Sequence, residues 1–148
     1  MRGIWMNEPI RKALAEDAEA CAGVLNAWID ATDWMPRSIE ADALVEILRE
    51  GLPKREAYVI GEPVAGYLSM DPAEAHIWGL YVGRRGQGLG KALMDQAKAG
   101  RDFLSLNSHA ANKSAHRFYA REGFKQVGEP WDGSDGIPEI RMEWRRDG

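Results

Sequence analysis

The sequence has little of several features that mark particular classes of protein. Cys21 is the single cysteine among 148 residues, which excludes an intramolecular disulfide and a thiolate metal cluster and fits a reducing cytosol. No run of about 18 apolar residues occurs, and the opening MRGIWMNEP has no apolar segment of the kind found in signal peptides. These absences predict a cytoplasmic protein that is not exported through a signal peptide and does not span a membrane.

Positive charge is not in excess either. There are 19 lysines and arginines against 23 aspartates and glutamates, a net charge of −4, which argues against a general nucleic-acid binder. Internal repeats and low-complexity segments are also missing. What the chain has is the length and the 45% hydrophobic content of one globular domain, so residues 1–148 are expected to form a single domain around one core.

Apolar residues recur with helical or strand spacing along the chain. Spacings of three and four predict helices at residues 17–32, 38–51, 88–99 and 112–122, with Ser38 as the cap of the second. Alternating and apolar runs predict a short entry strand at 9–10 and further strands at residues 57–61, 63–70, 75–82, 103–108, 124–127 and 140–144. An antiparallel meander followed by helical crossovers predicts an α+β fold with a mixed sheet.

A glycine-rich segment, LYVGRRGQGLGKAL at residues 80–93, joins a predicted strand to a predicted helix. The free amides of a helix N-terminus bind anions, and glycines let a phosphate approach the backbone. The Walker loop needs a glycine where Arg85 stands and serine or threonine where Ala92 stands. The dinucleotide fingerprint needs a glycine at Lys91 or Leu93. A nucleotide-binding module is therefore disfavoured.

A third phosphate-binding pattern fits the same segment. Arg85, Gly88 and Gly90 form R-x-x-G-x-G, which resembles the acyl-CoA pyrophosphate loop of the GNAT superfamily of N-acetyltransferases. A second segment, NKSAHRFYAREGF, resembles the later motif of that family, N-x-x-A-x-x-F-Y-x-x-x-G-F, from Asn112 to Phe124. Two independent patterns thus agree in order and separation.

The resemblance spans nearly the whole chain and is strongest over residues 75–124. It implies one GNAT domain, with a mostly antiparallel central sheet of about six to seven strands flanked by about four helices. It also implies an enzyme that moves an acetyl group from acetyl-CoA to a primary amine. The alternative is a non-catalytic acyl-CoA-binding or regulatory domain of the same fold. Exposed strand edges of this fold can support a homodimer, although no residue pattern here specifies one.

By position, the resemblance assigns acetyl-CoA binding to Leu80, Tyr81, Val82, Arg85, Gly86, Gln87, Gly88, Leu89, Gly90, Lys91, Asn112 and Tyr119. Either Leu80 or Tyr81 would offer its backbone amide to the thioester carbonyl, and Tyr119 would protonate the leaving sulfur. The structural interpretation of Tyr119 is a core aromatic residue whose hydroxyl bonds the backbone. Asn112 also has an ordinary role as a helix cap.

Acetyl transfer also needs a base, because an alkylamine with a pKa near ~10.4 is protonated at neutral pH. The two-residue period of a strand predicts that His76, Trp78, Leu80 and Val82 share one face. The family often carries glutamate or histidine at the positions that Trp78 and His76 occupy here, and of these two only His76 can accept a proton. His76 is therefore the candidate base, against a merely polar edge residue, with Glu74 or a chain of waters as other routes.

Two loops usually wall the acceptor pocket in this family, and here they read DATDWMPRS and EPWDGSDGIPE. Trp34 and Trp131 in these loops, together with Trp78, are candidate acceptor-binding residues that would suit a small cationic amine. A peptide N-terminus or a lysine side chain is the alternative acceptor. His109 and His116 have no carboxylate at metal-ligand spacing, so they are expected to be solvated, with no metal bound.

The glycine-rich loop departs from the family pattern in length. The family commonly has more residues between the last valine of the strand and the loop arginine, whereas only Gly83 and Arg84 separate Val82 from Arg85 here. The loop amides can still reach a pyrophosphate if Val82 leaves the strand early. The assignment of the Leu80 or Tyr81 amide as the donor to the thioester carbonyl depends on where Val82 leaves the strand.

Overall fold

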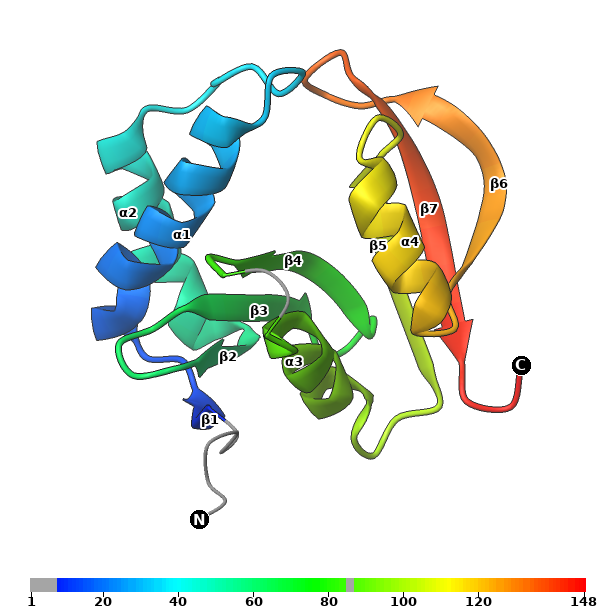
Figure 1. The fold of residues 1–148 in the computed structure, drawn as a ribbon, viewed down its shortest axis with the longest axis horizontal. Helices are drawn as coiled ribbons and strands as arrows, with labels where there is room; N and C mark the ends of the chain where they lie inside the picture. Colours follow the sequence, from blue (N-terminus) through cyan, green and yellow to red (C-terminus); the bar gives the residue numbers. More distant parts are fainter. Residues whose placement is uncertain (1–7, 85–86) are drawn as a thin grey trace.

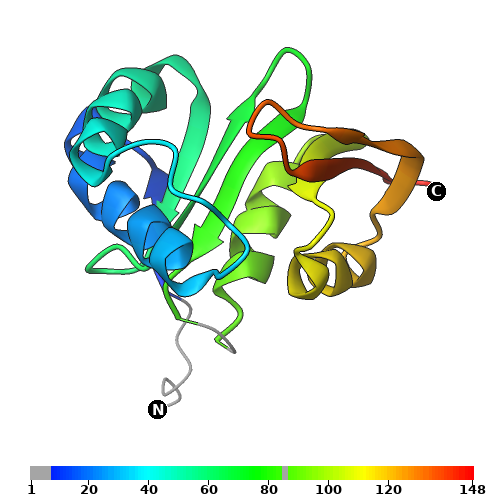
Figure 2. The same ribbon diagram turned by 90° about the horizontal axis from the view of Figure 1, so that it is seen from above.

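A computed structural model describes residues 8–84 and 87–148, in which a seven-stranded sheet carries helices on both faces (Figures 1 and 2). The helices are α1 (Ala18–Ala31), α2 (Ala41–Gly51), α3 (Leu89–Lys98) and α4 (Lys113–Arg121). The strands are β1 (Ile10–Lys12), β2 (Glu56–Ile60), β3 (Gly66–Asp71), β4 (His76–Val82), β5 (Phe103–His109), β6 (Lys125–Asp132) and β7 (Pro138–Arg145). The predicted order of elements and the α+β class with a mostly antiparallel sheet are confirmed. Within the described ranges, no helix is both long and apolar enough to cross a bilayer.

The sheet changes from antiparallel to parallel pairing at its centre. The strand order is β1-β2-β3-β4-β5-β7-β6, and β4 and β5 are the parallel neighbours. They pair at His76 with Ser105 and at Ile77 with Leu106, and then diverge, as the angle between β4 and β5 in Figure 1 shows. A gap is thus left between the carboxyl ends of two parallel strands.

The helices are held to opposite faces of the sheet by two apolar cores, and the expectation of one core is wrong because the sheet lies between them. In one core, α1 and α2 pack on β2 and β3, with Cys21, Leu44 and Tyr67 buried there. The other core lies under α3 and α4 and includes Leu68 and Leu93. Figure 2 shows α1 and α2 on one side of these strands and α3 on the other. Burial raises the pKa of the Cys21 thiol to about 12, so this cysteine is an unreactive core residue.

Some elements begin or end at other residues than the sequence predicts. α2 begins at Ala41 and is not capped by Ser38. Arg37 reaches back to Asn26 and Asp30 on α1, and the residue before α2, Glu40, has an extended backbone. β6 and β7 are longer than predicted, because cross-strand pairing continues through residues that the sequence assigns to a loop.

β4 contains a β-bulge at Trp78. Two consecutive residues of β3 pair with Ile77 and Gly79, so Trp78 between them has no partner in the ladder. The side chain of Trp78 is 56% exposed, consistent with its place outside the regular pairing. An extra residue of this kind reverses the alternation of side chains between the two faces of a sheet.

The prediction that His76, Trp78, Leu80 and Val82 share one face is therefore wrong. The register places His76 on the face of Tyr81, whereas Leu80 and Val82 pack against the core under α3. A strict two-residue period cannot anticipate this, because the bulge depends on how β3 and β4 pair. The candidate base thus faces one side of the sheet, and the side chains of Leu80 and Val82 face the other.

Candidate functional site

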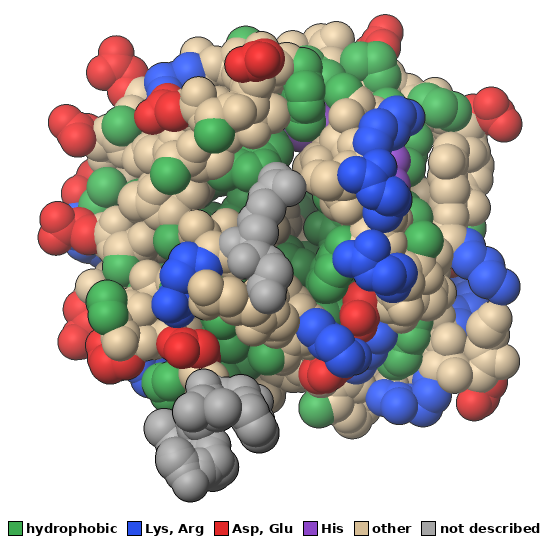
Figure 3. Space-filling model, in the orientation of Figure 1, with side chains coloured by type: hydrophobic (Ala, Val, Ile, Leu, Met, Phe, Trp, Pro, Cys, Tyr) green, Lys and Arg blue, Asp and Glu red, His purple; other side chains and the backbone are tan. Residues whose placement is uncertain are grey.

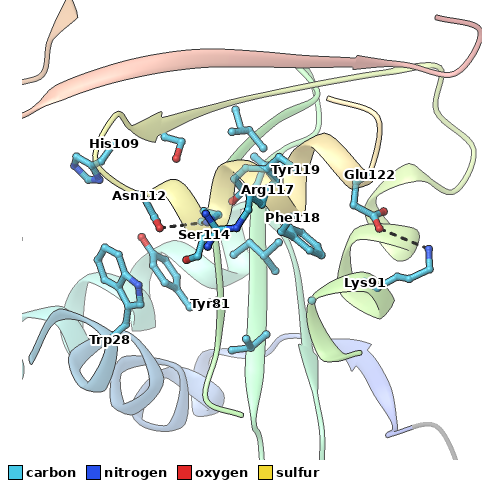
Figure 4. A pocket seen from close by; sticks show the side chains of 18 of the residues that line it. Trp28, Tyr81, Lys91, His109, Asn112, Ser114, Arg117, Phe118, Tyr119 and Glu122 are labelled. Atoms are coloured by element: carbon cyan, nitrogen blue, oxygen red, sulfur yellow. Dashed lines mark hydrogen bonds and ion pairs between the residues drawn. The ribbon is translucent and has the colours of Figure 1, made fainter. Parts of the chain in front are cut away.

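A cavity of about 730 Å³ occupies the gap between β4 and β5. Its wall comes from α1, β4, the start of α3, the end of β5, α4 and β7 (Figure 4). The residues assigned from the sequence that line it are His76, Trp78, Leu80, Tyr81, Val82, Gly88, Leu89, Gly90, Lys91, Asn112 and Tyr119. Gln87, Trp34 and Trp131 do not line it, and Arg85 and Gly86 lie outside the residues that the structure describes.

One end of the cavity has the features of an anion-binding site. Gly88 adopts a left-handed conformation with φ 73°, and α3 begins at the next residue, Leu89. The first amides of α3 have no partner within the helix and carry the positive end of its dipole. Arg84, Arg117 and Arg121 also line the cavity, and the guanidinium of Arg84 lies 3.3 Å from Oε1 of Glu8. Figure 3 shows Lys and Arg side chains gathered over α4 beside the hollow.

The side chain of Lys91 is engaged by acidic neighbours. Its Nζ lies 3.4 Å from Oδ1 of Asp95 and 3.7 Å from Oε2 of Glu122. The negative charges of Glu122 and then Asp95 raise the pKa of Lys91. Figure 4 shows the ion pair between Lys91 and Glu122, which joins α3 to the end of α4. What Lys91 offers to an anion is therefore chiefly its backbone amide.

The strand pairing identifies which backbone amides of β4 face the gap. Gly83 donates its N–H to the carbonyl of Ala65 at 2.7 Å, and in an antiparallel pair every second residue does the same. Tyr81 therefore donates its N–H to β3, whereas the N–H groups of Leu80 and Val82 point into the gap that β5 has left. Of the two sequence candidates for the thioester carbonyl, this geometry favours Leu80.

Val82 does not leave the strand early. It pairs with Gly66 of β3, and the hydrogen bond from Gly83 continues the pairing by one more residue. A Cβ on Gly66 would lie 2.9 Å from the carbonyl oxygen of Tyr81, so the two strands are in close contact here. The early departure of Val82 from the strand, which the sequence offered as one way for the short loop to reach a pyrophosphate, does not occur, because the pairing with β3 holds β4 to its end.

Tyr119 lines the cavity from α4 and is held by aromatic neighbours. The centroid of its ring lies 5.5 Å from that of Phe118 and 5.7 Å from that of Phe124. Burial raises the pKa of the Tyr119 hydroxyl well above its ordinary value, so the phenol keeps its proton at neutral pH. A fixed and protonated hydroxyl on the wall is what the role of acid requires.

His76 lines the cavity at the point where β4 and β5 still pair. Its Nδ1 lies 2.7 Å from Oγ of Ser105, and its ring makes an edge contact with Trp78. Burial, and then the positive charge of Arg141, lower the pKa of His76, so the imidazole is neutral at neutral pH. The ring is able to accept a proton, and its role as base stays a prediction.

The end of the cavity away from Lys91 and Glu122 is aromatic. Trp28 of α1 lies on the wall and contacts the rings of Tyr81 and Trp34. Trp34 in turn packs against the ring of His109, with centroids 5.3 Å apart. We call these four rings, Tyr81, Trp28, Trp34 and His109, the aromatic bridge, because they connect β4 to β5 across the gap. Figure 4 shows Trp28, Tyr81 and His109 at this end.

Several wall residues were not assigned from the sequence. Trp28 stands at core spacing in α1, and nothing in the sequence indicates that it faces a cavity. Asn107, Ser108 and Glu139 reach the wall through the pairing of β5 with β7. The basic residues of α4 did carry a signal, because residues 113, 117 and 121 are all basic at a spacing of four, which places them on one helix face.

His109 has a carboxylate partner, contrary to the sequence expectation. Its Nε2 lies 3.1 Å from Oδ2 of Asp135, which is 26 residues away in the β6–β7 turn. His116 is not simply solvated, since its Nε2 donates to the carbonyl of His109 at 3.0 Å. Both expectations are wrong because they consider only sequence spacing, and the turn folds back to β5.

Potential metal-ligating atoms of His109, Asp135 and Glu139 lie within 4.8 Å of one another. His109 and Asp135 already bind each other through a hydrogen bond, and Oδ1 of Asp135 accepts the backbone N–H of Ile137. We therefore interpret the group as a hydrogen-bonded cluster. The expectation that no metal is bound stays a prediction.

Comparison with known proteins connects this fold to one family. The family model described as an acetyltransferase (GNAT) domain matches residues 16–146. The chain therefore belongs to the GNAT family and is an acetyltransferase, and the resemblance inferred from the two sequence motifs is confirmed.

Individual relatives agree with this assignment. Peptidyl-lysine N-acetyltransferase YjaB of Salmonella typhimurium is 30% identical over 126 residues, covering 80% of this chain and 84% of that protein. The solution structure of apo YjaB from Escherichia coli matches with a TM-score of 0.75 at 25% identity, covering 94% of this chain and 98% of that one. The structure of yncA from Salmonella typhimurium with its cofactor acetyl-CoA has the same fold, with a TM-score of 0.68 at 22% identity and 95% of each chain covered.

Proposed function

We propose that this protein transfers the acetyl group of acetyl-CoA to a primary amine, and that the amine is the side chain of a protein lysine. The observation that carries the proposal is one cavity with two chemically different ends. The start of α3 and the arginines beside it form the anion-binding end, and the aromatic bridge forms the other. The phosphates of acetyl-CoA suit the first end, and the amine and aliphatic chain of a lysine suit the second.

The residues at the start of α3 fit the pyrophosphate of acetyl-CoA. A Cβ built on Gly88 meets no atom within 4 Å, so the backbone there is open to a ligand. A Cβ on Gly90 would lie 3.4 Å from the ring of Phe118, an ordinary contact distance, so α3 begins close to α4 at this residue. Arg117 and Arg121 supply positive charge along the same wall.

Acetyl-CoA would supply an acyl group activated as a thioester, and residues of this chain would act on it from two sides. The backbone N–H of Leu80 would donate a hydrogen bond to the carbonyl oxygen, where negative charge develops during transfer. Tyr119 would give its proton to the leaving sulfur, since its raised pKa keeps it protonated until then.

The aromatic end supports a cationic acceptor. Trp28 and Tyr81 offer ring faces to an ammonium group and to its aliphatic stem, and Glu139 adds a carboxylate to the wall. The relative YjaB is named for the acetylation of peptidyl lysine, which favours a lysine side chain. A small cationic amine, which the loop composition favours, would use the same groups.

The test compares three acceptors with acetyl-CoA as donor. These are an N-terminally blocked peptide with one lysine, a lysine-free peptide with a free N-terminus, and spermidine, with release of CoA and product mass as readouts. We expect kcat/KM for the lysine peptide to exceed that for the free N-terminus by about tenfold or more, a difference of about 1.4 kcal/mol. The same blocked peptide with arginine in place of lysine is the matched control and should not react.

Other outcomes identify the alternatives. Higher kcat/KM for spermidine than for the lysine peptide would assign the protein to small amines. Saturable binding of acetyl-CoA without turnover of any acceptor would support the non-catalytic domain. Competition by ATP but not by CoA would contradict acetyl-CoA as the ligand.

A further inference from the structure

We propose that His109, held by Asp135, is the base that takes the proton from the acceptor amine. The inference rests on the proposed function, because it needs an amine acceptor. It differs from the assignment that the sequence favours, in which His76 has this role. Position, hydrogen bonding and packing of the His109 ring each support it.

His109 and Leu80 lie on the two sides of the gap, shortly beyond the point where β4 and β5 stop pairing. β4 and β5 make their last pair at Ile77 and Leu106, and each of the two residues lies three positions further along its own strand. Because the strands run in parallel, the N–H of Leu80 and the imidazole lie on opposite walls of one cavity. An acceptor amine between these walls would lie near both the thioester carbonyl and His109.

The hydrogen bond to Asp135 determines which ring nitrogen of His109 is free. Oδ1 of Asp135 accepts the N–H of Ile137 at 3.0 Å, and Oδ2 lies 3.1 Å from Nε2 of His109. Both bonds lower the pKa of Asp135, so it is an ionised carboxylate and can only accept. Nε2 therefore carries a proton, and in the neutral form of the ring Nδ1 holds the lone pair. Within the described residues, Nδ1 makes no hydrogen bond.

Contacts on several sides hold the imidazole in place. Trp34 packs on the ring, and the carbonyl of His109 accepts hydrogen bonds from Nε2 of His116 and from the N–H of Asn112, each at 3.0 Å. The titratable groups around the ring are Asp135 from the β6–β7 turn, Glu139 from β7 and His116 from α4. An imidazole oriented by a carboxylate is an arrangement suited to general base catalysis.

The proton balance of the reaction is complete with these groups. The acceptor enters as an ammonium and loses two protons when the C–N bond forms and the C–S bond breaks. One proton goes to Nδ1 of His109 and from there to solvent. Tyr119 gives its own proton to the sulfur, which leaves as the thiol of CoA, and the second proton of the amine then reprotonates Tyr119.

His76 is the competing base, and its position suits the role less well. It lies where β4 and β5 still pair, below the divergence of the strands, and its Nδ1 is engaged with Oγ of Ser105. Trp78 contacts one edge of its ring. The same substitution made separately at His109 and at His76 therefore shows which of the two is the base.

The central experiment compares His109→Gln with His76→Gln. Glutamine can still donate an N–H to Asp135 but cannot accept a proton at neutral pH. For His109→Gln we expect kcat for the blocked single-lysine peptide to fall by about 100-fold or more, with KM for acetyl-CoA changed by less than about twofold. The inflection that ends the acidic limb of the pH profile should disappear, so that the rate keeps rising with pH toward the pKa of the amine. Added imidazole should restore part of the activity of His109→Ala, whereas His76→Gln should keep the acidic limb.

Asp135 is tested as a positioning residue. Asp135→Asn should lower kcat by about tenfold with little change in KM for acetyl-CoA, because the ring loses the carboxylate that orients it. Asp132→Asn is the matched control, since Asp132 is exposed in the same hairpin and does not line the cavity. We expect no change for this control.

The outcomes that overturn the proposal are distinct. Normal kcat and an intact acidic limb in His109→Gln would exclude His109, and loss of that limb in His76→Gln would assign the base to His76. Loss of wild-type activity in EDTA, restored by Zn²⁺, would indicate a metal in place of the base. A wild-type protein without turnover of any amine would refute the proposed function and the base together, whereas an active wild type beside an unimpaired His109→Gln would refute the base alone.

Discussion

Tyr119 and His76 line the same cavity, and burial shifts their pKa values in opposite directions. Surroundings of low polarity disfavour the charged form of each group, which is the phenolate for tyrosine and the imidazolium for histidine. At neutral pH the phenol of Tyr119 is therefore protonated, and the imidazole of His76 is neutral. Burial alone thus makes Tyr119 a proton donor and leaves His76 able to accept a proton.

Tyr119→Phe tests the donor. The phenyl ring fills the space between Phe118 and Phe124, so KM for acetyl-CoA should change little, while kcat should fall by about 100-fold because the sulfur loses its proton source. Since the pKa of Tyr119 is raised, kcat of the wild type should show no alkaline decline up to about pH 10. Steady-state kinetics across pH check both statements, and an unchanged kcat in the variant would remove Tyr119 from the mechanism.

The hydrogen bonds of Asp17 make the stability of the protein depend on pH. Its buried carboxylate accepts hydrogen bonds from Arg11 at 2.8 and 2.9 Å and from the N–H of Leu14 at 2.8 Å, and the bond from Arg11 is the main cause of its lowered pKa. A carboxyl whose pKa is lower in the folded state stabilises the protein above its unfolded value of 3.8 and loses this effect as pH falls through the folded value.

Asp17→Asn should therefore lower the free energy of unfolding by about 1.5–3 kcal/mol at pH 7. Its difference from the wild type should shrink below the unfolded value of 3.8, when Asp17 takes up a proton. Urea denaturation at pH 7 and in this acidic range measures the change. Glu19→Gln, at an exposed site in the first turn of α1, is the control and should show little effect. A difference that stays constant into strong acid would contradict the assignment.

At the scale of elements, β4 determines the form of the site. Its antiparallel pairing with β3 holds to the end of the strand, while its parallel pairing with β5 stops after Ile77. The bulge at Trp78 lies next to the point where the two strands diverge. The N–H groups of Leu80 and Val82 are consequently left facing a cavity in place of a neighbouring strand.

Gly88 begins α3 in a conformation that other residues rarely adopt. Gly88→Ala should lower the free energy of unfolding by about 1–2 kcal/mol, because alanine disfavours a φ of 73°. The cost comes from the backbone conformation and not from a clash, since an added Cβ would meet no atom within 4 Å. Gly88→Asn should cost less, since asparagine tolerates this region. Gly23→Ala inside α1 is the matched control and should stabilise by about 0.5–1 kcal/mol. Chemical denaturation ranks the three variants, and equal effects of alanine at both glycines would contradict the argument.

At the scale of the whole molecule, two parts of the structure meet across the cavity. The aromatic bridge connects α1 and the segment after it to the end of β5, and the β6–β7 turn adds Asp135 behind His109. The cavity wall thus contains residues from nearly the whole length of the chain, from Trp28 to Glu139. A ligand that contacts this wall should stabilise the fold as a unit.

Acetyl-CoA should therefore raise the melting temperature. At a concentration about 100 times Kd, it should add about 2.7 kcal/mol to the free energy of unfolding. For a chain of this size that corresponds to about 5–10 °C. ATP at the same concentration is the control, because it shares the adenine and phosphates but lacks the pantetheine arm and the acetyl group. Equal stabilisation by ATP would contradict acetyl-CoA as the specific ligand.

The sequence by itself determined the order of elements, the family and the helix starts that border the cavity. These depend on short continuous segments, in which a glycine at positive φ, a helix start and a capping residue follow one another. Gly88 before α3 and Asn112 at the start of α4 are local features of this kind, and the Oδ1 of Asn112 accepts the N–H of Ala115 as a cap does. Local backbone chemistry is readable from neighbouring residues.

Only the tertiary structure decided which side chains meet around the cavity. The bulge at Trp78 depends on how β3 pairs with β4, and it moved His76 to another face than the sequence period predicts. The contact between His109 and Asp135 joins residues 26 positions apart, and Trp28 reaches the wall from α1. Such contacts arise from the pairing of distant strands and the packing of helices on them, which no spacing within one segment encodes.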